Sequence, residues 1–257
     1  MRKNKMNFAK ASGWITLTIG AISLITSILY NSHILAFIGL GLIFWGIILT
    51  YIQTEEYVKQ SLLTATASSN LTTINQIMKE LGCEEKAIYL PPQYFINPEV
   101  NKAYIPKDRN LKIPNPYQIQ GKENNFFLQN PQGILLTPPG SELTRLFEET
   151  LETSFTKVDL KYLQLNLPKL LIEDLEIAQD VDITVENNKV NVTILNSAYQ
   201  NLTKETAKLS KLYRSLGCPL SSAIACALAK ATGKPVIIEK QQINDKDRAI
   251  KIEYLLV

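Results

Sequence analysis

Histidine and cysteine, which supply many catalytic pairs and zinc sites, are scarce in this 257-residue sequence. His33 is the only histidine, and it lies between two apolar stretches near the N-terminus. Residues 53–257 therefore offer no Cys–His or Ser–His pair and no histidine ligand for zinc. We expect no catalytic residues of these kinds, no metal site and no cofactor.

Charge is missing from residues 13–52, which contain no Asp, Glu, Lys or Arg. Two apolar runs, at residues 13–30 and 34–52, fill this stretch. Each run is close to the roughly 20 residues that a helix needs to cross a hydrocarbon core. Because only three residues separate the runs, the sequence predicts a transmembrane helical hairpin.

The charges around the hairpin predict its orientation. The basic tail at residues 1–12 holds Arg2, Lys3, Lys5 and Lys10 and no acid. Basic flanks stay on the cytoplasmic side, and two crossings return the chain to that side. We therefore expect a two-span protein of the cell membrane with both termini in the cytoplasm. A cleaved signal peptide is the alternative, but a second span follows at once and no cleavage site is evident.

Cysteine usage agrees with a cytoplasmic location for residues 53–257. Cys83, Cys218 and Cys226 are odd in number and lack the spacing of a disulfide framework, as is typical of a reducing compartment. Without the tail, 23 basic and 24 acidic residues remain. This balance argues against nucleic acid as a partner, because nucleic-acid binding needs a basic face.

Small residues recur along both spans at steps of three and four, which predicts close helix packing. One interpretation is that the two seams pack on each other and form a simple anchor. The other is that one seam remains for a partner helix or a second copy of the chain. A channel or transporter is not expected, because the spans carry no charged residue. The seam residues are Gly13, Thr16, Gly20, Ser23 and Ser27 in the first span, and Ala36, Gly39, Ile43, Gly46 and Thr50 in the second.

Residues 53–82 are expected to form a connecting amphipathic helix that ends at Gly82. Its apolar stripe would pack on the following domain or, as a parallel stalk, on a second copy. Residues 83–139 hold nine of the twelve prolines and predict short strands with long loops. The stripe consists of Ala67, Leu71, Ile74, Met78 and Leu81, and the strands are expected at 87–90, 102–105 and 133–137.

The remaining sequence alternates helical patterns with β-hairpins, which predicts an α+β domain of antiparallel hairpins and helices at residues 83–257. A two-residue turn at Asn187-Asn188 predicts the first hairpin, and Ser141 is expected to be an N-cap. Glu148, Glu149 and Glu152 are expected on a solvated helix face. The predicted helices begin at 141 and span 160–178, 202–216 and 219–232; the predicted hairpins span 181–195 and 235–256.

The most site-like stretch comprises Gly217, Cys218, Ser221 and Ser222. It places a cysteine at a helix N-cap, Pro219 at the first helical position and two hydroxyls in the first turn. Free amides there could hold an anion or lower the pKa of the thiol. The alternative is a tightly packed helix start. That interpretation is favoured by a row of small residues, Ala223, Ala225, Ala227 and Ala229.

Several motifs carry a resemblance to a known group of proteins. With the hairpin, YLPP (89–92), AYIP (103–106), GILLTPPGSELTRLFE (133–148) and LGCPLSSAIACALAKATGKPVIIE (216–239) resemble an uncharacterised group of archaeal membrane proteins. The resemblance implies a two-span anchor with a cytoplasmic α+β domain and brings no activity. The closing helix and hairpin also resemble vinyl-reductase-type ligand-binding domains, without the cysteine-bearing end that those domains carry.

The sequence thus predicts a non-enzymatic, membrane-anchored module that binds a protein partner, a small ligand or a second copy of itself. One alternative is a membrane-bound sensor or enzyme whose pocket lies near residues 217–222, under the loops of residues 91–139. Another alternative is an accessory subunit of a larger membrane complex.

Overall fold

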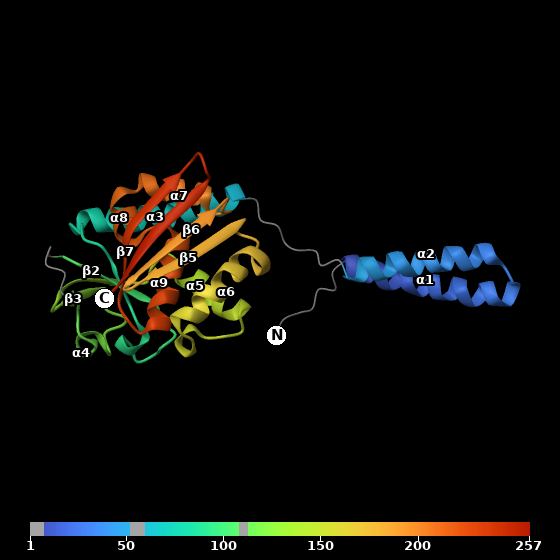
Figure 1. Ribbon diagram of the computed structural model, residues 1–257, viewed down its shortest axis with the longest axis horizontal. Helices are drawn as coiled ribbons and strands as arrows, with labels where there is room; N and C mark the ends of the chain where they lie inside the picture. The colour runs from blue at the N-terminus through green and yellow to red at the C-terminus, as the bar shows by residue number, and fades with distance from the viewer. Residues whose placement is uncertain (1–7, 52–59, 108–112) are drawn as a thin grey trace. The chain divides into compact units, whose positions relative to one another are not determined.

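The computed structural model describes residues 8–51, 60–107 and 113–257 (Figure 1). The chain divides into two compact units between residues 58 and 59. The first unit is a pair of helices, α1 (Phe8–Tyr30) and α2 (His33–Tyr51), joined by a short turn. Both helices are long and apolar enough to cross a membrane. Their outward side chains are strongly exposed, with Ile28 at 81% and Phe37 at 82%.

The two helices touch along glycines. A Cβ atom built on Gly20 would lie 2.9 Å from the Ile43 backbone nitrogen, and one built on Gly39 would lie 3.0 Å from the Leu24 nitrogen. The Ser23 hydroxyl also donates a hydrogen bond to the Leu35 carbonyl across the pair, at 3.2 Å. Glycine is thus required sterically at these positions, because any side chain would push the helices apart.

The second unit is built on one antiparallel sheet with the strand order β3-β4-β2-β1-β7-β8-β6-β5. This sheet, packed with helices, confirms the predicted α+β fold. The Asn187-Asn188 hairpin is also confirmed, because Glu186 pairs with Lys189 across it. The strands are β1 (Ile88–Leu90), β2 (Lys102–Pro106), β3 (Phe127–Gln129), β4 (Gln132–Leu136), β5 (Asp180–Glu186), β6 (Lys189–Leu195), β7 (Val236–Asn244) and β8 (Ala249–Leu256).

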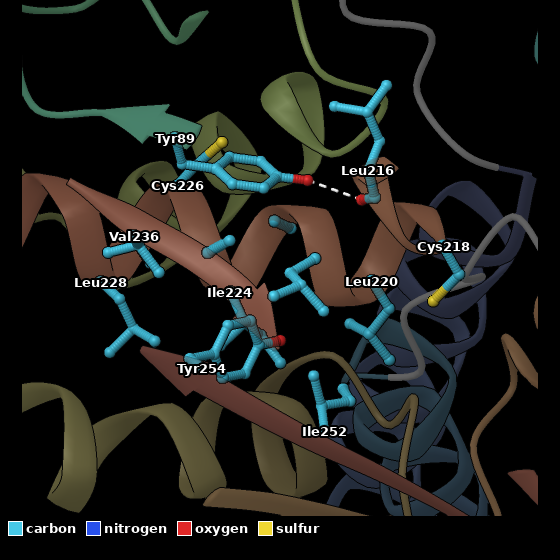
Figure 2. Packing of buried hydrophobic residues seen from close by; sticks show 14 of the residues in the cluster. Tyr89, Leu216, Cys218, Leu220, Ile224, Cys226, Leu228, Val236, Ile252 and Tyr254 are labelled. Atoms are coloured by element: carbon cyan, nitrogen blue, oxygen red, sulfur yellow. Dashed lines mark hydrogen bonds between the residues drawn. The ribbon is translucent and has the colours of Figure 1, made fainter. Parts of the chain in front are cut away.

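One helix forms the centre of the domain. Every residue of α9 from Leu220 to Lys230 is buried, and its apolar side chains pack against those of the sheet (Figure 2). A third segment, Ser210–Thr232, is also apolar enough to cross a membrane, but it is 83% buried inside this domain. The helices are α3 (Gln60–Glu80), α4 (Pro116–Ile119), α5 (Ser141–Thr150), α6 (Leu160–Lys169), α7 (Gln200–Lys208), α8 (Ser210–Leu216) and α9 (Pro219–Thr232).

The sheet has two different faces. One face carries the main core, to which α3 and α5 to α9 all contribute buried side chains. A smaller core on the opposite face joins Ile88 and Tyr104 of the sheet to Tyr94, Phe95 and Ile119 of the proline-rich segment. The opposite face of β5, β6 and β8 carries polar side chains instead, among them those of Asn191, Thr193, Lys251 and Glu253.

Three local predictions are wrong. The helix expected at 202–216 is broken at Leu209, whose backbone is not helical (φ −90°, ψ 77°). Asn75 of α3 supports the break, because its buried side chain accepts the Leu212 N–H at 3.1 Å. The N-cap of α5 is Gly140 rather than Ser141. The helix expected at 160–178, with a kink or a second segment at Pro168, continues through Pro168 and ends earlier, in a π-helical turn at Leu170–Asp174.

The connecting helix packs on its own domain. Leu71 and Met78 of α3 are buried in the main core, and Ala67, Ile74 and Leu81 pack against it. The stripe is therefore not available for a parallel dimeric stalk. The start predicted for this helix, at residues 53–59, lies outside the described residues.

Candidate functional site

The turn at residues 217–222 forms a tightly bonded helix start. Cys218 is the N-cap of α9: its Sγ accepts the Ser221 N–H at 3.4 Å, while the Ser221 Oγ accepts the Cys218 N–H at 2.8 Å. Pro219 occupies the first helical position, where its missing N–H costs nothing. Gly217 adopts a positive φ of 71°, which favours glycine. The local sequence thus determines the geometry of the turn.

Neighbouring elements enclose the turn. Cys218, Ser221 and Ser222 are completely buried. The Tyr254 hydroxyl donates to the Ser221 carbonyl at 2.9 Å, and the Tyr89 hydroxyl donates to the Leu216 carbonyl at 2.6 Å (Figure 2). These contacts match the interpretation as a packed helix start. Ligand binding by Gly217, Cys218, Ser221 and Ser222 stays a prediction.

The loops predicted to roof this turn span residues 91–139, and the residue that directly follows them, Gly140, contacts the turn. Gly140 donates its N–H to the Ser222 Oγ at 3.1 Å. It packs so closely that an added Cβ would lie 2.1 Å from the Ala223 nitrogen. By contrast, Tyr94 and Phe95 belong to the core on the opposite face of the sheet. Tyr94 and Phe95 therefore lie on the face of the sheet opposite the 217–222 turn.

The buried Ser215 Oγ near this region has no hydrogen-bond partner among the described residues, and the buried Gln241 Nε2 has only a poorly aligned contact with the Tyr213 hydroxyl. The Gln241 Oε1 accepts a hydrogen bond from the Ser221 Oγ at 2.9 Å, so this side chain touches the turn directly. Buried polar groups are normally paired with protein or water. The Ser215 Oγ is the feature beside the turn that favours a small polar ligand.

Burial controls the protonation of the groups around α9. Desolvation raises the pKa of Cys226 to about 12 and the pKa of Tyr213 to about 12. It raises the pKa values of Tyr89 and Tyr254 well above their usual range. At neutral pH the Cys226 thiol and these three phenols are therefore protonated, so Cys226 is not a thiolate nucleophile.

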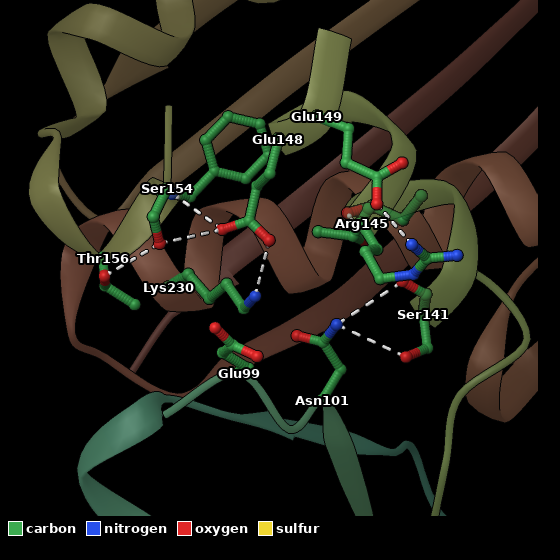
Figure 3. Close-up of polar contacts among 12 residues, drawn as sticks. Glu99, Asn101, Ser141, Arg145, Glu148, Glu149, Ser154, Thr156 and Lys230 are labelled. Carbon is green, nitrogen blue, oxygen red and sulfur yellow. Dashed lines mark hydrogen bonds and ion pairs between the residues drawn. The ribbon is translucent and has the colours of Figure 1, made fainter. Parts of the chain in front are cut away.

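A buried ion pair lies on the other side of α9, where the sequence predicted solvated acids. Glu148 of α5 contacts Lys230 of α9 at 2.8 Å, and the two side chains are only 15% and 4% exposed (Figure 3). The expectation for Glu148 is therefore wrong, whereas Glu149 and Glu152 are exposed as expected. Lys230 was the sequence signal for this ion pair. It is the single charged residue in an apolar helix, and a buried lysine needs a partner.

A polar cleft of about 970 Å³ lies where three loops meet at one end of the sheet. It is lined by residues before β5, by residues around the start of α7, and by the turn between β7 and β8. This cleft could not be predicted from the sequence, because its walls are distant in the chain. The charged lining residues are Glu176, Lys204, Asp245 and Arg248, and the side-chain amides are those of Gln179, Asn196, Gln200 and Asn201.

A metal centre would need several suitable ligands together. Within residues 8–51, 60–107 and 113–257, no group of three or more His, Cys, Asp or Glu residues could hold a metal ion. The three cysteines are all buried and unbridged.

The family of the chain is identified by comparison with known proteins. A family model described as a domain of unknown function (DUF7982) matches residues 3–254. The chain belongs to this family. The family match covers both the helix pair and the α+β domain, as the resemblance to a whole-chain membrane-protein group implied. It assigns no activity, and the archaeal origin stays a prediction.

Two other comparisons bear on the resemblance to vinyl-reductase-type domains. Neither the curated proteins nor the solved structures contain a match to the chain. The resemblance of the closing helix and hairpin to vinyl-reductase-type domains therefore stays a prediction.

Proposed function

We propose that this DUF7982 protein is a two-span membrane protein whose α+β domain is a non-enzymatic binding module in the cytoplasm. The observation that carries this proposal is that small and large residues occupy different sides of the helix pair. The glycines fill the contact between α1 and α2, and the large apolar side chains point outward and are exposed. Lipid is the environment that such an exterior requires.

The magnitude of the exposed apolar surface supports the anchor. Ile28, Leu29 and Phe37 are each at least 75% exposed in the isolated pair. Burying one such side chain contributes about 1.5–3 kcal/mol, so several of them together hold the protein in a bilayer. The basic tail favours the cytoplasmic side for both termini.

The assignment of a binding role rests on the α+β domain. It has its own core on the helical face of the sheet, so the anchor is not needed to complete that core. Its buried thiol Cys226 is protonated, and the chain contains no histidine in this domain. An open polar sheet face and a polar cleft leave surface for a partner or a ligand.

The proposal is tested by fractionation and by capture. The full-length protein should stay in membranes washed with alkaline carbonate, and a variant lacking residues 1–52 should be released. Both forms, purified from the host, should retain the same partner or ligand, because the domain is the binding unit. Release of the full-length protein would contradict the anchor. Absence of any bound molecule in both forms would contradict the binding role.

A second candidate places a small polar ligand beside the 217–222 turn. It is supported by the buried Ser215 Oγ, which has no hydrogen-bond partner among the described residues. Replacing Gln241 with Leu would remove the polar side chain that contacts the turn. The variant should lose a co-purified ligand that mass spectrometry detects in the parent protein, whereas an unchanged ligand content would contradict this site.

A further inference from the structure

The polar cleft at the end of the sheet is held in a preformed shape by backbone hydrogen bonds. The Asn196 N–H donates to the Arg248 carbonyl at 2.9 Å, the Gln179 N–H to the Leu195 carbonyl at 3.0 Å, and the Ala198 N–H to the Ile177 carbonyl at 2.8 Å. These bonds tie together all three loops that line the cleft. Ligand sites are usually largely preformed in this way.

The same loops hold unusual backbone conformations. Three of their residues adopt left-handed φ angles without being glycine: Glu176 at 49°, Asn196 at 48° and Arg248 at 49°. Such conformations are uncommon for glutamate and arginine and persist only where the surroundings impose them. Two of these residues, Glu176 and Arg248, carry charges and line the cleft.

The charges of the cleft are only partly matched within the protein. Lys204 of α7 contacts Asp245 of the β7–β8 turn at 2.7 Å, which neutralises one cation and one anion. Arg248 and Glu176 also line the cleft, but within the described part of the chain neither forms an ion pair within 4.0 Å, with each other or with another residue. The cleft therefore presents one unmatched cation and one unmatched carboxylate.

We propose that this cleft binds a zwitterionic small molecule of the amino-acid class, with its carboxylate at Arg248 and its ammonium group at Glu176. A purely anionic ligand would face the carboxylate of Glu176, and a purely cationic ligand would face the guanidinium of Arg248. A ligand with both charges meets both residues. The guanidinium is suited to a carboxylate because its planar fork donates two parallel hydrogen bonds.

The amide side chains beside these charges supply further recognition. The Asn196 amide donates to the Gln179 side-chain oxygen, so these two side chains hold each other in place. Gln200 and Asn201, at the start of α7, offer donors and acceptors to a polar substituent of the ligand. A cleft of about 970 Å³ has room for an amino acid or a short peptide. This inference specifies a ligand class for the proposed binding module and rests on that function.

The test uses the full-length protein in nanodiscs and the twenty common amino acids, offered singly in calorimetric titrations. At least one should bind. Its N-acetyl derivative and its carboxamide derivative should each bind about tenfold more weakly or worse, because each lacks one charge. Failure of all twenty to bind at 10 mM (roughly −2.7 kcal/mol) would overturn the proposal, as would derivatives that bind as well as the parent amino acid.

Variants assign the two charges to the two residues. Arg248→Gln should weaken binding of the amino acid about tenfold, and this variant should no longer prefer the amino acid to its carboxamide. Glu176→Gln should also weaken binding about tenfold, and it should no longer prefer the amino acid to its N-acetyl derivative. Arg248→Lys, which keeps the charge, should retain part of the affinity. The matched controls Lys251→Gln and Glu173→Gln change exposed residues that do not line the cleft and should bind normally. Normal binding by Arg248→Gln and Glu176→Gln would overturn the assignment.

The outcome is separable from that of the proposed function. If no amino acid binds but a partner is still captured by the domain, the cleft assignment fails and the binding module stands. If the titrations and the capture experiment both fail, both proposals are overturned.

Discussion

The Lys230 Nζ lies 2.8 Å from the Glu148 Oε2 in the interior of the domain, and this contact joins α9 to α5. The other oxygen of Glu148 accepts the Phe155 N–H at 2.8 Å and the Ser154 hydroxyl at 3.2 Å. One carboxylate thus connects α5, the turn that follows it and the central helix. The lysine lies in the last turn of α9, where the helix dipole also favours a cation.

Removing one partner of this ion pair should destabilise the domain strongly. Lys230→Met leaves the Glu148 carboxylate buried without its cation, which should lower the free energy of unfolding by about 3 kcal/mol or more. Urea denaturation followed by circular dichroism measures the change. The double variant Glu148→Leu, Lys230→Met should recover much of the loss, because two apolar side chains carry no desolvation penalty.

The control for this prediction is Lys234→Met, which changes an exposed lysine just beyond the same helix. It should alter the free energy of unfolding by less than about 0.5 kcal/mol. Equal effects at positions 230 and 234 would show that the buried pair does not contribute as described.

The glycines of the helix pair should tolerate substitution very differently. A side chain at Gly39 would collide with Gly20 and Leu24, whereas a Cβ at Gly41 meets nothing within 4 Å. Gly39→Leu should separate α1 from α2, and Gly41→Leu should not. Spin labels at the exposed positions 18 and 44 report the distance between the helices in detergent. An unchanged distance in Gly39→Leu would contradict the glycine contact.

Gly140 should be intolerant of even one methyl group. An added Cβ would lie 2.1 Å from the Ala223 nitrogen and 2.5 Å from the Pro219 carbonyl oxygen, both of which are fixed in α9. Gly140→Ala should therefore lower the free energy of unfolding by about 3 kcal/mol. Gly121→Ala is the comparison, because that glycine has a positive φ of 80° but open space around it. It should cost only about 1–2 kcal/mol of backbone strain.

Much of the fold was predictable because its signals are local. The uncharged runs at 13–30 and 34–52 predicted the helix pair, and alternation around Asn187-Asn188 predicted a hairpin. Pro219 and Gly233 predicted both ends of α9, where they mark the first helical position and the left-handed C-cap. Each of these signals depends on a residue and its immediate neighbours.

The features that were missed depend on contacts between distant residues. The break at Leu209 is supported by Asn75, which lies 137 positions from its hydrogen-bond partner. Glu148 looks like a surface acid until Lys230 is placed beside it, 82 positions later. The polar cleft brings together three loops with no shared motif. Spacing along the chain cannot show such contacts.

Alkaline pH should weaken the domain through its buried thiol. Burial raises the pKa of Cys226 from 9.0 to about 12, so the folded state holds a proton that the unfolded state releases earlier. The stabilisation is complete below pH 9 and is lost as the pH rises from 9 toward 12, by at most about 1.4 kcal/mol per pH unit for this group. Urea denaturation at pH 8, 9 and 10 measures the decline.

Cys226→Ala isolates the contribution of this thiol. The variant should lose stability less steeply than the parent protein between pH 9 and pH 10, whatever its stability at pH 8. Parallel pH profiles for the two proteins would show that another group controls the alkaline transition.

Cysteine labelling in intact cells tests the central claim, a two-span anchor with the α+β domain in the cytoplasm. His33→Cys marks the turn between α1 and α2, and Lys251→Cys marks the exposed face of β8. A membrane-impermeant maleimide should label position 33 in intact cells and should label position 251 only after the membrane is permeabilised. Labelling of position 251 in intact cells, or protection of position 33 there, would contradict the account.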